Sequence, residues 1–98
     1  MNLDPPPVSE LRKTRPAVVL SADALNRARR TVVIVPLSTG PTPRPPIVIA
    51  SPSAGDGAVA VCDQIRAVDK GRLIRRERVL DAADMRRIEA ELRTVLEL

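Results

Sequence analysis

One run of β-branched side chains limits the folds that are open to this chain. Residues 31–37 read Thr-Val-Val-Ile-Val-Pro-Leu, and such side chains favour the pleated surface of a sheet. We therefore expect a strand over residues 31–37. Pro36 should lie near its end or at a bulge, because proline has no N–H to donate to a neighbouring strand.

Shorter apolar runs on both sides of this segment predict further strands. They lie at residues 17–20, 47–50 and 58–66, and a short segment starts at Leu73 and ends near Leu80. Residues 1–15 include three consecutive prolines and are expected to form a loop. Turns or loops are expected at 21–30, with one helical turn, and at 38–46, 51–57 and 69–71.

The chain from Asp81 onward predicts an amphipathic helix. Asp81 suits the N-cap, and Asp84 suits the positive end of the helix dipole. The apolar residues of one stripe are Met85, Ile88, Leu92, Val95 and Leu96. The fold class is therefore mainly β with α: a small, partly open antiparallel barrel or sheet closed by a C-terminal amphipathic helix. Residues 1–98 are too few for more than one domain.

The side-chain inventory excludes several kinds of chemistry. The chain has no His, Phe, Tyr or Trp. Without His there is no imidazole base, no Ser-His-Asp triad and no His-ligated metal. Without aromatic rings the usual platform for base stacking is missing. Cys62 is the single cysteine and cannot form an internal disulfide or a Cys-rich zinc site. We expect no metal and no cofactor.

The charge is unevenly distributed along the chain. The formal net charge is +4, yet the segment from Asp81 to Leu98 holds five acidic residues against three arginines. The preceding part is therefore basic, which suits RNA, DNA or an acidic protein as a partner, or is simply a solvated surface. No apolar run approaches the roughly 18 residues of a membrane span, and no signal peptide is evident, so we expect a soluble cytoplasmic protein.

Four motifs occur in a characteristic order and spacing. They are Thr-Arg-Pro-Ala-Val-Val-Leu-Ser at 14–21, Asn-Arg at 26–27, Val-Ile-Val-Pro-Leu-Ser at 33–38 and Asp-Gln-Ile-Arg-Ala-Val-Asp-Lys-Gly-Arg-Leu at 63–73. Together they resemble the MazF/PemK/Kid family, the toxins of bacterial type II toxin–antitoxin modules. The resemblance runs from about residue 3 to the C-terminus.

This resemblance implies a fold, an activity and two partners. The fold would be the SH3-like, CcdB/MazF-like sheet with a C-terminal helix. The activity would be metal-independent, sequence-specific cleavage of single-stranded RNA, usually mRNA. The partners would be a second copy, packed around residues 31–37 and the C-terminal helix, and a cognate acidic antitoxin. The disordered end of that antitoxin would lie over residues 8–15 and 38–46, in the RNA groove.

The chain also departs from the family pattern. Relatives usually start with a strand of the type Arg-Gly-Asp-Ile-Tyr-Trp-Val upstream of the position that Leu3 matches, and the chain here begins at Met1. We therefore expect an open sheet edge near the start of the chain. The glycines of the family's first loop are replaced by the sequence at Val8–Lys13, which predicts a stiffer and more basic loop.

The resemblance implies catalytic roles for Arg15 and Ser38. The planar guanidinium of Arg15 can stabilise charge on two phosphate oxygens, but it stays protonated and is a poor general base. The Ser38 hydroxyl can hold a phosphate oxygen, and Thr39 could take its place if the match is shifted by one residue. The alternatives are structural: Arg15 pairs with a nearby carboxylate, and Ser38 completes a turn.

Further candidates surround these two residues. Glu10 could take the 2′-OH proton of RNA or support the loop, or it is a solvated charge. Gln64 could read a base edge, while Arg66 in the same motif is expected to hold strands together. The basic loop residues expected on phosphates are Arg12, Lys13 and Arg44. The cluster of Arg72, Arg75, Arg76 and Arg78 is either a solvated face or a surface for an acidic antitoxin.

Two other functions remain open. A non-catalytic SH3-like binding module, such as a decayed toxin, fits the missing first strand. A CcdB-like poison of DNA gyrase would share the fold, but that activity resides in a C-terminal tip bearing Trp. The chain here ends Val-Leu-Glu-Leu.

Overall fold

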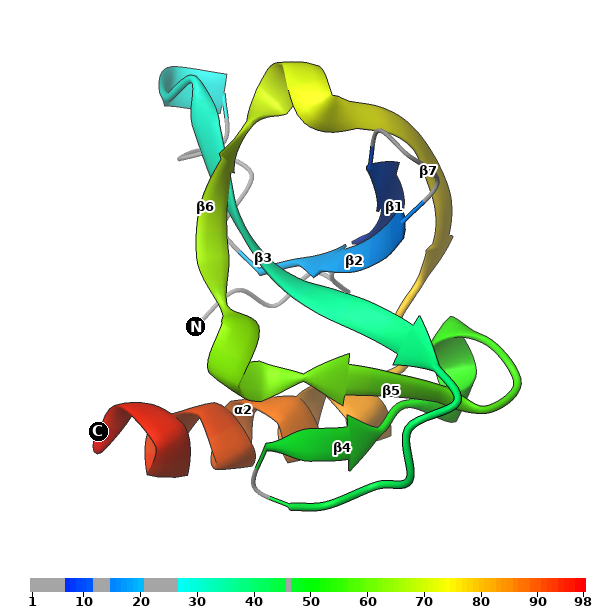
Figure 1. Cartoon of the computed structure of the whole chain (residues 1–98). Coiled ribbons are helices and arrows are strands. Elements are labelled where there is room, and N and C mark those ends of the chain that lie inside the picture. The colour runs from blue at the N-terminus through cyan, green and yellow to red at the C-terminus, as the bar shows by residue number, and fades with distance from the viewer. Residues whose placement is uncertain (1–6, 12–14, 21–26, 46) are drawn as a thin grey trace.

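The computed structural model describes residues 7–11, 15–20, 27–45 and 47–98 (Figure 1). Its strands are β1 Pro7–Leu11, β2 Arg15–Val19, β3 Thr31–Thr39, β4 Val48–Ala50, β5 Ala58–Val61, β6 Arg66–Asp69 and β7 Leu73–Val79. The short 3-10 helices are η1 Pro52–Ala54, η2 Cys62–Gln64 and η3 Lys70–Arg72, and the C-terminal helix is α2 Ala82–Leu96.

The strands form one antiparallel sheet in the order β4-β5-β3-β2-β1-β7, and β6 pairs with β3 beside this path. The long strand β3 is the centre of the sheet. One of its edges pairs with β2, and its other edge pairs with β6 through residues 31–34 and with β5 through residues 37–39. Figure 1 shows the sheet curling into a ring, with α2 running below β5 and behind β4. The prediction of a mainly antiparallel sheet with a C-terminal helix is confirmed.

The predicted strand at residues 31–37 is confirmed and extends to Thr39. Pro36 lies inside this strand, three residues before its last residue, Thr39. It pairs with Ala17 of β2, and on the other edge it falls between the residues that pair with β6 and those that pair with β5. A residue without an N–H is tolerated there because that edge has no partner at this position.

The loop predicted for residues 1–15 is wrong for Pro7–Leu11, which form β1. Pro7 is the first residue of the strand, where proline is compatible with a sheet. Val8 and Leu11 are buried, and β1 pairs with both β2 and β7. The open edge that we expected near the start of the chain is therefore not at β1, because β7 covers it.

The single strand predicted for residues 58–66 is also wrong, because η2 divides it into β5 and β6. These two strands pair with successive parts of the same edge of β3. The chain changes direction at η2, where the Cys62 N–H donates to the Ile47 carbonyl at 2.7 Å. Ala58, Val59 and Ala60 are all buried, so both faces of β5 are covered.

Two apolar clusters cover the two faces of the curled sheet. One cluster lies between the sheet and α2 and includes Val18, Val35, Ile88 and Leu92. The second lies on the other face and includes Leu11, Ala17, Val19, Val32, Ile34 and Val68. Val18 and its two neighbours in β2 belong to different clusters because successive side chains of a strand point to opposite faces.

Helix α2 begins as predicted. The Asp81 carboxylate accepts a hydrogen bond from the Asp84 N–H at 2.8 Å and caps the helix. Ile88 and Leu92 are buried in the predicted stripe, whereas Leu96 is 45% exposed. No helix in the described part of the chain is long and apolar enough to cross a membrane.

Asp84 does more than complement the helix dipole. Its carboxylate is buried and accepts hydrogen bonds from the Ser53 N–H at 2.8 Å and the Ser53 hydroxyl at 2.5 Å, and it pairs with Arg87. The same hydroxyl accepts from the Asp81 N–H at 3.0 Å. These bonds attach α2 to η1, which follows β4.

We expect Asp84→Ala to lower the free energy of unfolding by about 2 kcal/mol, because it leaves the donors of Ser53 without their acceptor. Denaturant unfolding measures this loss. Glu89→Ala on the same helix is the control and should change the free energy by less than about 0.5 kcal/mol. Equal effects of the two substitutions would contradict a special role for Asp84.

Candidate nucleic-acid interface

A groove of about 630 Å³ lies beside the C-terminal end of β3. Six strands of the sheet, β1 to β6, contribute to it because the curl of the sheet brings them together. The groove is lined by Leu11, Pro16, Pro36, Leu37, Ser38, Thr39, Pro41, Val48, Val61, Gln64 and Arg66. None of these residues is acidic, so the described lining favours a negatively charged ligand.

Three of the predicted site residues meet in this groove. Ser38 and Thr39 come from the end of β3, where Ser38 pairs with Val59 of β5 and is half-buried. Gln64 ends η2 and is exposed. Two hydroxyls and a carboxamide therefore line the same space, and they can donate hydrogen bonds to phosphate oxygens or to base edges.

Arg15 is placed by its backbone at the rim of the groove. It is the first residue of β2 and pairs with Leu11 of β1. Leu11 lines the groove, and so does Pro16, which follows Arg15 in the chain. Arg12 and Lys13 lie outside the described residues.

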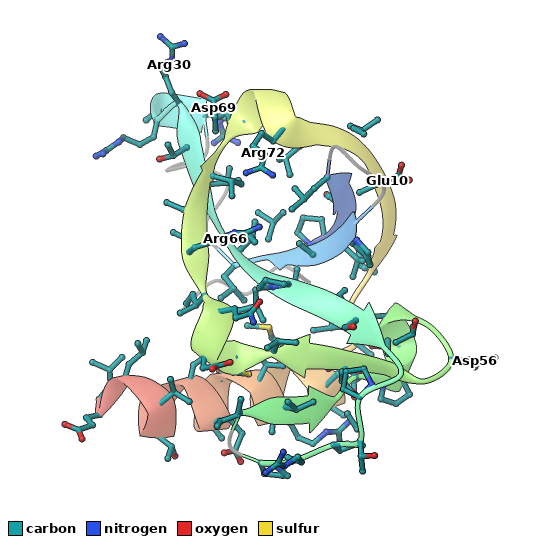
Figure 2. All side chains as sticks on the ribbon, viewed as in Figure 1. Glu10, Arg30, Asp56, Arg66, Asp69 and Arg72 are labelled. Carbon is teal, nitrogen blue, oxygen red and sulfur yellow. The ribbon has the colours of Figure 1, made fainter. Side chains whose placement is uncertain are left out.

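Glu10 and Arg44 are not among the lining residues. Glu10 pairs with Pro16 and precedes Leu11, and Figure 2 shows its carboxylate outside the ring of strands. It faces away because neighbouring side chains of a strand point to opposite faces. Arg44 is exposed, and its N–H donates to the Val48 carbonyl at 2.7 Å in an isolated bridge.

The structure adds Arg66 to the candidate site. The backbone of Arg66 does pair with Ile34 of β3, as expected of a residue that holds strands together, but its side chain is exposed and lines the groove. Figure 2 shows this side chain pointing into the ring of strands. The sequence signal was the arginine two residues after Gln64. The place of Arg66 in the groove depends on the break in the chain at η2. The prediction of one continuous strand over residues 58–66 did not include that break.

Cys62 is excluded as a nucleophile of this site. Its side chain is fully buried in the apolar cluster beneath the sheet. Burial, followed by the negative charges of Glu91 and Asp63, raises the pKa of the thiol to about 11. The reactive thiolate is therefore scarce at neutral pH. Among the described residues, no group of three or more His, Cys, Asp or Glu side chains could hold a metal ion.

Comparison with known proteins identifies the family. Residues 1–96 match the model of the PemK-like, MazF-like toxins of type II toxin–antitoxin systems. An endoribonuclease from a mycobacterial species is 28% identical and superposes with a TM-score of 0.82, covering 94% of this chain and 88% of its own. A mycobacterial endoribonuclease in complex with its cognate antitoxin is 25% identical, with a TM-score of 0.77 and coverages of 100% and 96%.

A third structure supports the fold alone. The MazE–MazF complex from Deinococcus radiodurans is 21% identical and has a TM-score of 0.84, covering 100% of this chain and 99% of its counterpart. With its four motifs, its curled antiparallel sheet and a family match over nearly its whole length, the chain belongs to the PemK-like, MazF-like toxins of type II toxin–antitoxin systems.

Proposed function

We propose that this toxin is a metal-independent endoribonuclease that cuts single-stranded RNA by attack of the RNA's own 2′-OH. The observation that carries the proposal is the groove, which joins Ser38, Gln64 and Arg66 to the backbone of Arg15 and has no acidic residue in its described lining. The mycobacterial endoribonuclease of similar fold supports the same activity.

The reaction requires two proton transfers and stabilisation of one extra negative charge. The 2′-oxygen loses its proton and forms a bond to phosphorus, the bond from phosphorus to the 5′-oxygen breaks, and the leaving 5′-oxygen gains a proton. The products are a 2′,3′-cyclic phosphate and a 5′-OH end. The protein must hold the sugar and phosphate in line and stabilise the charge that develops on the phosphate oxygens.

We assign these tasks to the residues at the groove. Arg15 stabilises the developing charge, because a guanidinium presents two parallel donors to phosphate. Ser38 holds a phosphate oxygen, with Thr39 beside it, and Gln64 reads a base edge. Glu10 supports the β1 side of the site, since its carboxylate lies outside the groove lining. Arg12, Lys13 and Arg44 contact phosphates of the RNA from the neighbouring loops.

The experiment is incubation of the purified protein with mixed-sequence single-stranded RNA in EDTA. We expect cleavage to fragments with 2′,3′-cyclic phosphate (or 3′-phosphate) and 5′-OH ends. RNA binding without cleavage would identify a non-catalytic binding module instead. Inhibition of DNA gyrase without RNA cleavage would identify a gyrase poison.

We further propose a homodimer that is neutralised by an acidic antitoxin. The exposed Leu96 and Leu98 at the end of the chain are apolar surface for a second copy. The described lining of the groove contains Arg66 and no acidic residue, which suits an acidic chain. The antitoxin-bound relative supports the second partner. Light scattering of the toxin alone and with its partner measures both assemblies; a monomer that still cuts RNA would contradict the dimer.

A further inference from the structure

A second exposed arginine lies next to the groove but is not part of its lining. Arg72 is the last residue of η3, and the residue after it, Leu73, pairs with Leu11 of β1. Leu11 lines the groove. Directly paired residues of antiparallel strands have Cα atoms about 5 Å apart. Arg72 is therefore the chain neighbour of Leu73, which pairs with the lining residue Leu11. From this position its long side chain can place a positive charge beside the groove.

Arg66 and Arg72 face the same space. Figure 2 shows both side chains pointing into the ring of strands, from β6 and from η3, whereas Arg30 points away from it. Leu11, Val68 and Leu73 belong to the apolar cluster on this face. The side chains of Arg66 and Arg72 thus lie over the apolar side chains of this cluster. This arrangement suits a nucleic-acid strand, which carries charged phosphates and flat bases.

The backbone of η3 is held by several hydrogen bonds. The Asp69 carboxylate accepts from the Gly71 N–H at 2.7 Å, and the Lys70 N–H donates to the Arg30 carbonyl at 2.8 Å. The Leu73 N–H closes the turn onto the Lys70 carbonyl. Arg72 is therefore presented from a fixed turn, which reduces the entropy lost when it binds a ligand.

The charges of both arginines are available to a ligand. Neither Arg66 nor Arg72 forms an ion pair with another described residue. The nearby Asp69 uses one carboxylate oxygen to cap η3, and Glu10 lies outside the ring (Figure 2).

We propose that Arg72 binds a backbone phosphate of the RNA beyond the groove, so that the substrate crosses the ring from the groove past Arg66 to η3. This inference rests on the proposed function and adds a flanking site to it. A guanidinium contact to phosphate is independent of sequence, so Arg72 increases the affinity for longer single strands without selecting the cut site. The preferred partner is RNA and not an acidic peptide, because the arginines continue the groove that the substrate itself must occupy.

The test measures binding with RNA that cannot react, so that it does not depend on cleavage. The probes are a long and a short pool of mixed-sequence single-stranded RNA with every 2′-OH methylated. We expect Arg72→Gln to weaken binding of the long pool about tenfold at low salt and to leave the short pool unchanged. The slope of log affinity against log salt for the long pool should become shallower by about 0.7, the value for one phosphate contact on a single strand.

Two variants complete the test. Arg72→Lys should restore the salt slope, because a lysine also neutralises a phosphate. Arg30→Gln removes the same charge from a side chain that points away from the ring, and it should change neither pool. An unchanged salt slope in Arg72→Gln, equal weakening of both pools, or weakening only of the acidic antitoxin would overturn the inference. Absence of cleavage of unmethylated RNA by the wild type would overturn the proposed function instead.

Discussion

We expect Arg15→Ala to lower the rate of RNA cleavage about a hundredfold, equivalent to a barrier higher by about 3 kcal/mol. The physical reason is the negative charge that develops on phosphate oxygens in the transition state. Arg15 is the first residue of β2, and both its cross-strand partner Leu11 and its chain neighbour Pro16 line the groove. Pro16 also restricts the backbone conformation of Arg15. Single-turnover cleavage of a defined RNA separates this loss in rate from a loss in binding.

Three variants serve as comparisons for Arg15→Ala. Arg15→Lys should recover only part of the rate, because one ammonium group cannot replace two parallel guanidinium donors. Ser38→Ala should reduce the rate less than Arg15→Ala, since it removes one neutral hydrogen bond. Arg30→Ala removes an exposed arginine that points away from the ring of strands (Figure 2), so its single-turnover rate should stay close to wild type. A loss in Arg30→Ala as large as in Arg15→Ala would show that general charge, and not position, is responsible.

The second large effect concerns the substrate. An RNA with one 2′-deoxy nucleotide on the 5′ side of the cut should not be cleaved at that bond at all. The nucleophile of the proposed reaction is the 2′-oxygen of that nucleotide, so its removal deletes a reactant. Denaturing gel electrophoresis of the RNA, with the cut first mapped on the unmodified strand, measures this result.

A matched substrate carries the 2′-deoxy nucleotide on the 3′ side of the cut instead. It retains the nucleophile and should be cleaved at the same bond. Cleavage of the first substrate at the original bond would show that water attacks the phosphorus, and the proposed mechanism would then be wrong. That result would leave the assignment to the toxin family unchanged, because the family match does not depend on the mechanism.

Local sequence patterns were sufficient to predict those elements whose signal lies within a few neighbouring residues. The β-branched run at 31–37 predicted β3, and Asp81 predicted the N-cap of α2. The apolar stripe predicted the burial of Ile88 and Leu92. The family motifs already named Ser38 and Gln64, which the structure brings into one groove. Each of these signals depends on side-chain shape, capping or periodicity, and none requires knowledge of a distant partner.

Only the tertiary structure decided the features that depend on such partners. Pro7–Leu11 is a strand because β2 and β7 supply hydrogen bonds on both of its edges, which outweighs the local effect of the prolines. Asp84 is buried because Ser53, far away in sequence, supplies its donors. Arg66 lines the groove because η2 interrupts the apparent strand where the chain steps from one part of the β3 edge to the next. For residues other than proline, local propensities contribute at most about 1 kcal/mol per residue. Long-range pairing and burial therefore determine the structure wherever they favour a conformation that differs from the local preference.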